Sequence, residues 1–171
     1  MIEGIAGMME ITRESDQNPI ESLTSSELEG FITYRIVRLH AALDRQAVET
    51  LKRTSGMRQN EWKIISLLGL GRARNSTDIA RVTGMDPAII SRTLRSLEKD
   101  GLLLTERSEE DRRVVNLALS DRGRARFEAT FPHMLARQRT LLSALTTEER
   151  EIAWKILDKL ETVSEVREFN L

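Results

Sequence analysis

Ser91, Arg92 and Arg95 lie within about one turn of each other, in a stretch that begins with the small residues Pro87 and Ala88. A serine hydroxyl donates and accepts hydrogen bonds, and an arginine guanidinium presents a fixed fork of N–H donors with a permanent positive charge. The small residues ahead of them leave room for a close approach. This stretch can therefore hydrogen-bond and ion-pair with a polar, negatively charged partner.

A second polar cluster is the run SEEDRR, residues 108–113, which directly follows Arg107. Asp111 can orient Arg112 or Arg113 through a charge-assisted hydrogen bond, so that one guanidinium is already in place when a partner arrives. The alternative is a solvated turn whose charges cancel, because the run also contains three acids. The elements that carry the two clusters help to decide between these interpretations.

The first cluster is expected on a helix over 87–100, preceded by a short helix and a turn. Ala80, Gly84 and Ile90 follow one another at offsets of four and six residues. A small residue where two helices cross, a glycine at the turn and a β-branched anchor in the second helix are typical of a helix-turn-helix. The alternative is a plain helical hairpin with a solvated basic face.

The hydrophobic period changes after Gly101. LLLTER (102–107) and VVNLAL (114–119) are typical of two strands, with the run 108–113 as the loop between them. A helix-turn-helix followed by such a hairpin is a winged helix. The helix fits the major groove of DNA, and the narrow basic tip of the hairpin fits the minor groove, where negative potential is concentrated. The pattern predicts double-stranded DNA as the partner.

The other elements are expected to be helices, so that the fold class is mainly α with a small β-hairpin wing. We expect helices over about 27–53, 59–69 and 76–83, a long helix from Ser120 and a last helix capped by Thr146. The predicted organisation is a mobile arm over 1–24, a winged-helix domain over 25–165, a DNA-binding part over 57–119, and dimerisation helices over 25–53 and 121–168.

The first, the long and the last helix each carry an apolar stripe, and a small winged helix has no room to bury all three. Burial against a second copy solves this problem. A two-fold dimer also presents two recognition helices about one DNA turn apart. We therefore predict a homodimer; the alternative is a monomer that folds its own terminal helices into a bundle.

The charge distribution favours a polyanionic partner more than the net charge of −1 suggests. Residues 1–30 carry one basic and seven acidic residues, and residues 146–171 carry four basic and seven acidic ones. Residues 31–145 carry 21 basic against 13 acidic residues. A basic centre between acidic ends is the asymmetry that matters for nucleic acid, although an uneven scatter of charge in a helical protein is the alternative.

The sequence lacks the residues that several classes of function require. Cysteine is absent, which excludes disulfides, thiolate metal sites and thiol redox sensing. His40 and His133 lie far apart, without metal-ligand spacing, and neither a dinucleotide loop nor a Walker sequence occurs. We therefore expect no enzyme, no metal and no cofactor. The first residues show neither a signal peptide nor a membrane span, so a cytoplasmic protein that does not contact membranes is expected.

The run MDPAIISRTLRSLEKDGLLLTERSEEDRRVVNLALSDRGR resembles the MarR family of winged-helix transcription regulators, and the resemblance covers roughly 27–165. Its most specific parts are the Leu-Glu-Lys-x-Gly-Leu exit of the helix, the Asp-x-Arg wing and the Leu-Ser-Asp-x-Gly that follows. One departure is Arg58, where the family usually has Ser or Thr as the cap of the second helix.

The resemblance implies a role for each polar residue singled out above. It places Ser91, Arg92 and Arg95 on the major-groove helix, and Arg113 at the minor-groove tip with Asp111 as its brace. It places Ser76 and Thr77 at the start of the supporting helix, where contacts to phosphate are usual. The full set expected to contact DNA is Ser76, Thr77, Pro87, Ala88, Ser91, Arg92, Arg95, Arg107, Asp111, Arg112 and Arg113.

The expected function is thus a homodimeric, sequence-specific transcriptional regulator, a repressor, that binds a pseudo-palindromic operator. Family members often bind small aromatic anions beside the dimer helices; here Trp62, Tyr34, His40 and Arg35 either face such a crevice or are core and rim residues. The alternative function is a winged-helix module for protein contacts without specific DNA binding. It is consistent with the modest local charge, nine basic against eight acidic residues over 71–113.

Overall fold

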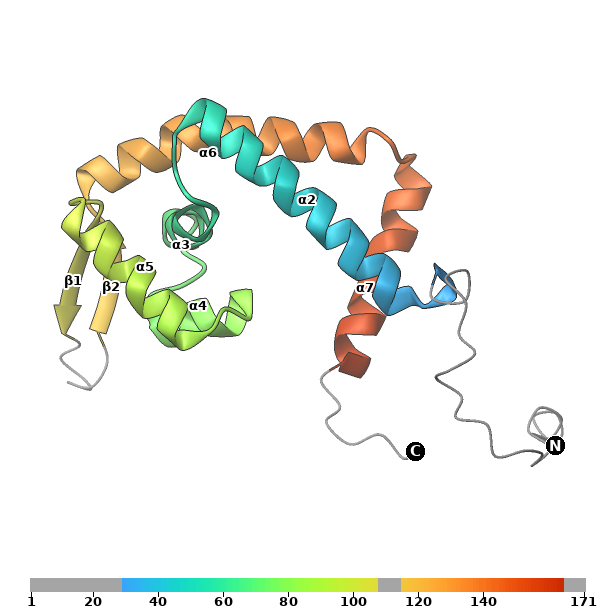
Figure 1. Cartoon of the computed structure of the whole chain (residues 1–171), viewed down its shortest axis with the longest axis horizontal. Helices are drawn as coiled ribbons and strands as arrows, with labels where there is room; N and C mark the ends of the chain where they lie inside the picture. The colour runs from blue at the N-terminus through green and yellow to red at the C-terminus, as the bar shows by residue number, and fades with distance from the viewer. Residues whose placement is uncertain (1–28, 108–114, 165–171) are drawn as a thin grey trace, which may run out of the picture. The chain divides into compact units, whose positions relative to one another are not determined.

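The computed structural model describes residues 29–107 and 115–164 (Figure 1). The chain divides into two units, residues 1–43 and 44–171, and helix α2 (Ile32–Thr54) contains the boundary between them. The other elements all belong to the second unit. They are α3 (Gln59–Gly69), α4 (Ser76–Thr83), α5 (Pro87–Lys99), β1 (Leu103–Arg107), β2 (Val115–Leu119), α6 (Asp121–Leu142) and α7 (Thr147–Ser164).

This order confirms the predicted fold class, a mainly helical chain with one antiparallel hairpin. The expected helix-turn-helix is α4 followed by α5, and the two strands pair with Leu103 opposite Leu119 and Arg107 opposite Val115. The expected helix over 87–100 ends one residue earlier, at Lys99, because Asp100 is its C-cap. The first expected strand begins one residue later, at Leu103, and the expected start of the second, residue 114, lies outside the described residues.

Side-chain caps fix where the helices begin, and the starts of α4, α5 and α7 agree with those expected from the sequence. Asn75 Oδ1 accepts a hydrogen bond from the Asp78 N–H at 2.9 Å, and Asp86 Oδ1 accepts from the Ala88 N–H at 2.8 Å. Thr146 and Glu149 form a reciprocal capping box at the start of α7. Each cap satisfies backbone N–H groups that lack a partner within the helix, so short local signals were enough to predict these boundaries.

Two glycines are required by the backbone around them. Gly84 ends α4 in the left-handed conformation, with φ of 64°, and so allows the sharp turn into α5. Gly123, in the first turn of α6, lies directly against the Leu102 carbonyl oxygen, where a Cβ atom would overlap that oxygen. The hairpin and α6 are therefore in backbone contact.

The core of the second unit holds α5 and the hairpin in place. It is formed by one cluster of buried side chains: Leu51, Met57, Trp62, Ile64, Ile65, Ala73, Ile79, Ile90, Leu97, Leu102, Leu103, Leu117, Leu119 and Phe127. The Leu117 N–H also donates to the Arg74 carbonyl at 2.8 Å, which joins the loop before α4 to β2. Helix α5 thus has a fixed position between the other helices and the hairpin.

The first helix differs from its predicted start. Glu29 and Gly30 are helical, the helix is interrupted at Phe31, and α2 begins at Ile32. Glycine loses more conformational entropy in a helix than any other residue, which explains a break beside Gly30. The predicted start near residue 27 and the predicted arm over 1–24 lie outside the described residues.

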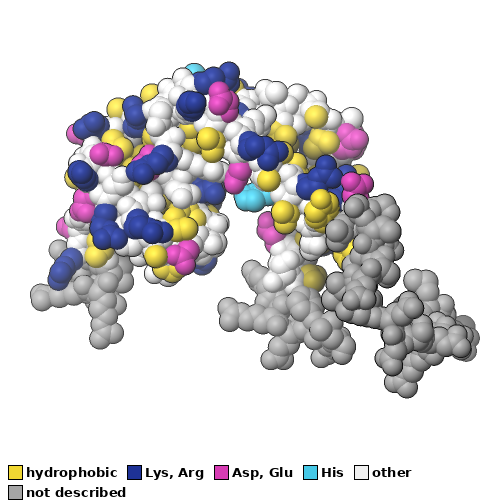
Figure 2. Space-filling model, viewed as in Figure 1, with side chains coloured by type: hydrophobic (Ala, Val, Ile, Leu, Met, Phe, Trp, Pro, Cys, Tyr) yellow, Lys and Arg dark blue, Asp and Glu magenta, His cyan; other side chains and the backbone are white. Residues whose placement is uncertain are grey.

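Helix α7 has no buried residue over its 18 positions. Its predicted apolar stripe includes Ile152 and Ile156, whose exposed fractions are 55% and 48%, and Trp154 is also half exposed. Hydrophobic side chains likewise reach the surface along α2 (Figure 2). These faces are apolar surface that the chain by itself leaves in contact with water.

Candidate nucleic-acid interface

Helix α5 presents its polar face because its apolar face is anchored in the core. Ile90 and Leu97 are buried on one face of α5, whereas Ser91 and Arg95 lie on a different face of the helix and are exposed. Ala88 lies exposed in the first turn. Lys and Arg side chains stand at the surface over α5 together with Asp and Glu side chains (Figure 2). The local charge is mixed, as the sequence indicated.

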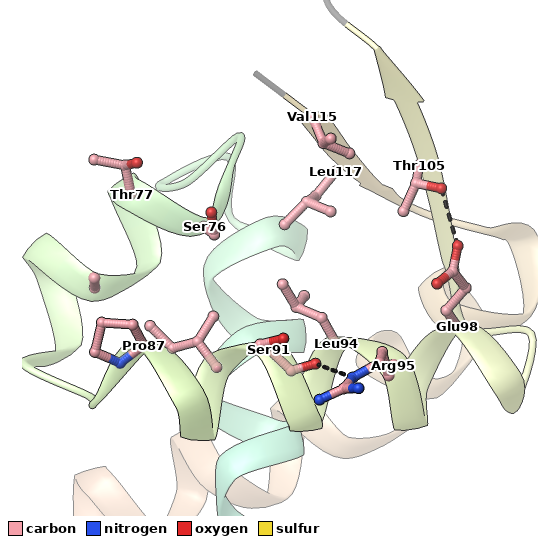
Figure 3. Close-up of a pocket in the computed structure, with 12 residues that line it drawn as sticks. Ser76, Thr77, Pro87, Ser91, Leu94, Arg95, Glu98, Thr105, Val115 and Leu117 are labelled. Carbon is pink, nitrogen blue, oxygen red and sulfur yellow. Dashed lines mark hydrogen bonds between the residues drawn. The ribbon is translucent and has the colours of Figure 1, made fainter. Parts of the chain in front are cut away.

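A groove of about 440 Å³ runs between α4, α5 and the hairpin (Figure 3). We call it the α4–α5–hairpin groove. Its lining residues are Ser76, Thr77, Ala80, Pro87, Ile90, Ser91, Leu94, Arg95, Glu98, Thr105, Val115 and Leu117. Five of the residues predicted to contact DNA therefore line one surface feature. The hydroxyl groups and the Arg95 guanidinium lie on its walls, and its remaining lining is largely apolar.

Two hydrogen bonds shape the α5 side of this groove (Figure 3). Arg95 Nε donates to the Ser91 carbonyl at 3.3 Å, so this guanidinium folds back along its own helix. Thr105 Oγ1 donates to Glu98 Oε1 at 3.0 Å, which joins β1 to the last turns of α5. Sequence patterns did not predict the second bond. This bond holds the Glu98 carboxylate in the same groove as the Arg95 guanidinium, where it opposes the binding of an anion.

The start of α4 is held by a carboxylate of its own first turn. Asp78 Oδ2 accepts a hydrogen bond from the Arg74 N–H at 2.9 Å, and Arg81 lies 3.4 Å from Asp78 Oδ1. The Arg74 N–H, and to a lesser extent Arg81, hold the pKa of Asp78 below its ordinary value. The loop before α4 is thereby tied to the helix whose first residues, Ser76 and Thr77, line the groove.

Arg92 lies on the other flank of α5, away from the groove. There a second hollow of about 410 Å³, which we call the α3–α5 cleft, is lined by Arg58, Asn60, Glu61, Ile89, Arg92, Thr93 and Ser96. Arg58 is the N-cap residue of α3, and its N–H donates to Glu61 Oε2 at 2.9 Å. An arginine has no acceptor for the return bond of a capping box, so its guanidinium bonds the same carboxylate instead.

The wing residues are only partly described. Arg107, at the end of β1, is exposed. Asp111, Arg112 and Arg113 lie outside the described residues, so their predicted contacts with a minor groove stay predictions.

The residues that the sequence suggested for a ligand crevice divide between the two units. Trp62 is a core residue, 8% exposed, whose ring stacks on Phe127 with centroids 6.1 Å apart. Tyr34 is partly exposed on α2, with the Arg38 guanidinium 5.9 Å from its ring centroid. Among the described residues no group of three or more His, Cys, Asp or Glu side chains is arranged to hold a metal ion. No helix in the described part of the chain is long and apolar enough to cross a membrane.

Comparison with known proteins finds a family model that matches the segment containing α3, α4, α5 and β1. Residues 57–115 match the MarR family. The uncharacterized HTH-type transcriptional regulator YdgJ of Bacillus subtilis (strain 168) is 26% identical over 106 residues, which are 62% of this chain and 65% of YdgJ. The match therefore spans just under two thirds of that relative's length.

Solved structures share the fold. A MarR/EmrR family regulator from Acinetobacter sp. ADP1 superposes with a TM-score of 0.74 at 24% identity, over 81% of this chain and 97% of that one. The transcriptional repressor CouR, in a structure bound to a 23-mer DNA duplex, superposes with a TM-score of 0.69 at 24% identity, over 81% and 98% of the two chains. The matched segment over 57–115 contains the α4–α5 pair and the first strand of the hairpin, so this part of the chain is similar to the MarR family, and the solved structures share its winged-helix fold.

Proposed function

We propose that the protein is a homodimeric, sequence-specific transcriptional repressor. Each subunit inserts α5 into the major groove of a pseudo-palindromic operator and places the tip of its wing, residues 108–113, at the minor groove. The observation that carries this proposal is that Ser91 and Arg95 on α5 share one groove with Ser76 and Thr77 at the start of α4. MarR proteins regulate transcription and are not enzymes, which is consistent with a surface that binds rather than reacts.

The geometry suits two kinds of contact, base contacts from α5 and phosphate contacts from the start of α4. An α-helix is 10–12 Å across with its side chains, and the major groove is about 12 Å wide, so α5 fits with its exposed face toward the base edges. Arg95 can exchange its bond to the Ser91 carbonyl for two bonds to one guanine. Ser76 and Thr77 lie where the N-terminus of α4 favours a phosphate. Base contacts specify the sequence, and phosphate contacts set the register.

Dimerisation is supported by the surface that the single chain leaves exposed. Helix α7 buries none of its residues, and the apolar side chains of α2 before residue 43 are also exposed. A monomeric soluble protein rarely keeps such extended apolar stripes in water, and a second copy of the same chain covers both by two-fold symmetry.

The operator is found by selection from a random duplex library at about 150 mM salt, followed by sequencing of the retained duplexes. We expect an inverted repeat with half-sites about 10 bp apart. A folded, dimeric protein that enriches no sequence would refute the proposal for the ligand-free protein, and the same selection repeated with small aromatic acids tests whether an effector is required.

The contact roles are separable on the selected operator. Ser91→Ala and Arg95→Ala should change which base is preferred, and loss of a bidentate base contact costs roughly 1–3 kcal/mol of discrimination. We assign a phosphate contact to Arg107, which is exposed at the end of β1, so Arg107→Ala should weaken binding to all sequences equally. Equal weakening in all three variants would show that α5 does not read bases.

The competing function is a winged helix for protein contacts. It is favoured by one observation, the near balance of charge over 71–113, to which Glu98 contributes within the groove itself. Salt dependence separates the two functions: DNA affinity falls steeply with ionic strength because counterions are released, whereas affinity for a protein partner falls far less.

A further inference from the structure

The α3–α5 cleft brings two arginines to the flank of α5 that faces away from the groove. Arg92 comes from α5 itself and Arg58 from the N-cap of α3, 34 positions earlier in the chain. Four further polar side chains line the same hollow: Asn60, Glu61, Thr93 and Ser96. Arg58 had no role in the sequence analysis beyond its departure from the usual Ser or Thr cap.

The Arg58 guanidinium is held in one orientation. Its Nε donates to Glu61 Oε1 at 2.7 Å, and its Nη2 bonds both Glu61 Oε1 and Ser96 Oγ, the latter at 2.7 Å. The hydrogen bond and charge of Glu61 raise the pKa of Arg58, a group that is charged at every physiological pH in any case. A guanidinium fixed in this way loses little conformational entropy when it binds an anion.

Glu61, the carboxylate that holds the Arg58 guanidinium, is largely buried, whereas the guanidinium itself is accessible to solvent. The Glu61 side chain is 11% exposed, whereas that of Arg58 is 72% exposed. The bonds to Glu61 and Ser96 use Nε and Nη2, and Nη1 has no hydrogen-bond partner among the described residues. Two N–H donors of a charged, positioned group therefore face the solvent beside Arg92.

The width of α5 determines which part of the DNA lies next to the Arg58 guanidinium. A helix that nearly fills the major groove brings each of its flanks close to one of the two sugar-phosphate walls. One flank is the α4–α5–hairpin groove, with Ser76 and Thr77. On the opposite flank the described cations of the cleft are Arg58 and Arg92. We propose that Arg58 and Arg92 together bind a backbone phosphate of the DNA, with Glu61 and Ser96 as positioning residues for Arg58.

This inference rests on the proposed function and adds Arg58, which is not among the residues expected from the sequence to contact DNA, to the interface. It identifies a second, sequence-independent anchor, so that α5 is held from both sides. The anchor also explains why a chain with nearly balanced local charge can bind a polyanion. Position matters more than the sum of charges when a few guanidinium groups reach the phosphates.

The test is the salt dependence of binding to a fluorescent 30-bp duplex of random sequence, measured by anisotropy from about 50 to 200 mM salt with the full chain. The variant is Arg58→Ser/Glu61→Gln, which removes an ion pair without changing the net charge and retains a serine cap for α3. The matched control is Arg53→Ser/Glu49→Gln, which removes an ion pair of α2 that lines neither hollow and whose arginine is as exposed as Arg58. Thermal melting confirms that each variant is folded.

We expect the slope of log Kd against log salt to decrease by about 0.9 for each subunit bound in the variant, and to stay unchanged in the control. Arg58→Gln, which keeps a hydrogen-bond donor for Glu61, should lose the same slope if the double variant does not fold. A wild-type slope in a folded variant overturns the inference and leaves Arg58 as a counter-ion of Glu61. If the wild-type protein binds no duplex even at 50 mM salt, the proposed function fails as well, and this outcome is distinct because all variants then behave alike.

Discussion

At the scale of single residues, Gly123 is the position, among the glycines that the structure describes, where an added Cβ would come nearest to another atom. Its Cα lies against the Leu102 carbonyl oxygen, so a methyl group would force the start of α6 away from the hairpin. We expect Gly123→Ala to lower the free energy of unfolding by about 2 kcal/mol or more, measured by urea denaturation. Gly30→Ala is the control, because a Cβ at Gly30 meets nothing within 4 Å. Equal stability of the two variants would contradict the contact.

Asp78 gives the protein a specific response to acid. Its pKa is lowered in the folded state, chiefly by the hydrogen bond from the Arg74 N–H. A depressed folded pKa contributes stability above the unfolded value, which is about 3.9 for aspartate, and this contribution is lost as the pH falls through that value toward the folded pKa. We expect Asp78→Asn to be less stable than wild type at pH 6 and to lose less stability between pH 5 and 3.

That comparison needs urea denaturation at each pH, with Asp158→Asn as the control for the loss of a carboxylate at an exposed position of α7. Parallel loss of stability with acid in wild type and Asp78→Asn would show that the bond to Arg74 does not stabilise the start of α4.

At the scale of elements, two substitutions separate the effects of the Thr105–Glu98 hydrogen bond, which joins β1 to α5, from those of the Glu98 charge. Thr105→Val removes the hydrogen bond to Glu98 and keeps the carboxylate, whereas Glu98→Gln keeps an acceptor and removes the charge. We expect Thr105→Val to cost about 1 kcal/mol of stability or less. Glu98→Gln should strengthen binding to a random-sequence duplex, because a negative charge leaves the groove.

Both quantities are measured on the same two proteins, by thermal melting and by anisotropy at about 100 mM salt. Weaker duplex binding by Glu98→Gln would show that the carboxylate acts only by holding β1 against α5.

The sequence predicted the elements well where the signal is local. The caps at Asn75, Asp86 and Thr146 and the turn at Gly84 depend on residues within four positions of each other, so a single sequence contains the whole cause. The class of the fold followed from the change of hydrophobic period after Gly101.

The candidate site was predictable only in part, because part of it depends on how elements pack. Arg58 and Ser96 are 38 positions apart and meet across two helices, and Thr105 reaches Glu98 only because β1 lies against α5. No spacing rule relates such pairs. The sequence indicated which side chains α5 exposes, whereas the assignment of Ser91 and Arg92 to different flanks required the coordinates.

At the scale of the whole molecule, the exposed stripe of α7 predicts the oligomeric state. Ile152→Glu/Ile156→Glu places two charges on that stripe, and neither side chain is buried within the chain itself. We expect sedimentation at about 10 μM to change from the mass of two chains to that of one, while the far-UV spectrum of the winged helix persists. Asp158→Lys, two turns or less away and outside the stripe, is the control and should leave the mass unchanged.

A wild-type protein that sediments as a single chain would contradict the dimer directly, as would a double variant that keeps the wild-type mass. DNA affinity then adds a second criterion, because a monomer engages one half-site and should lose the preference for inverted repeats.

The exposed face of α7 lies more than 40 positions beyond α5 in the chain, so the proposed dimer contact and the proposed operator contact are encoded in separate stretches of sequence. After gene duplication, substitutions along α7 would stop two copies from pairing with each other while both still bound the original operators. Substitutions on α5 alone would have the opposite effect: the subunits would still mix, and the mixed dimers would recognise asymmetric sites that neither parent binds well.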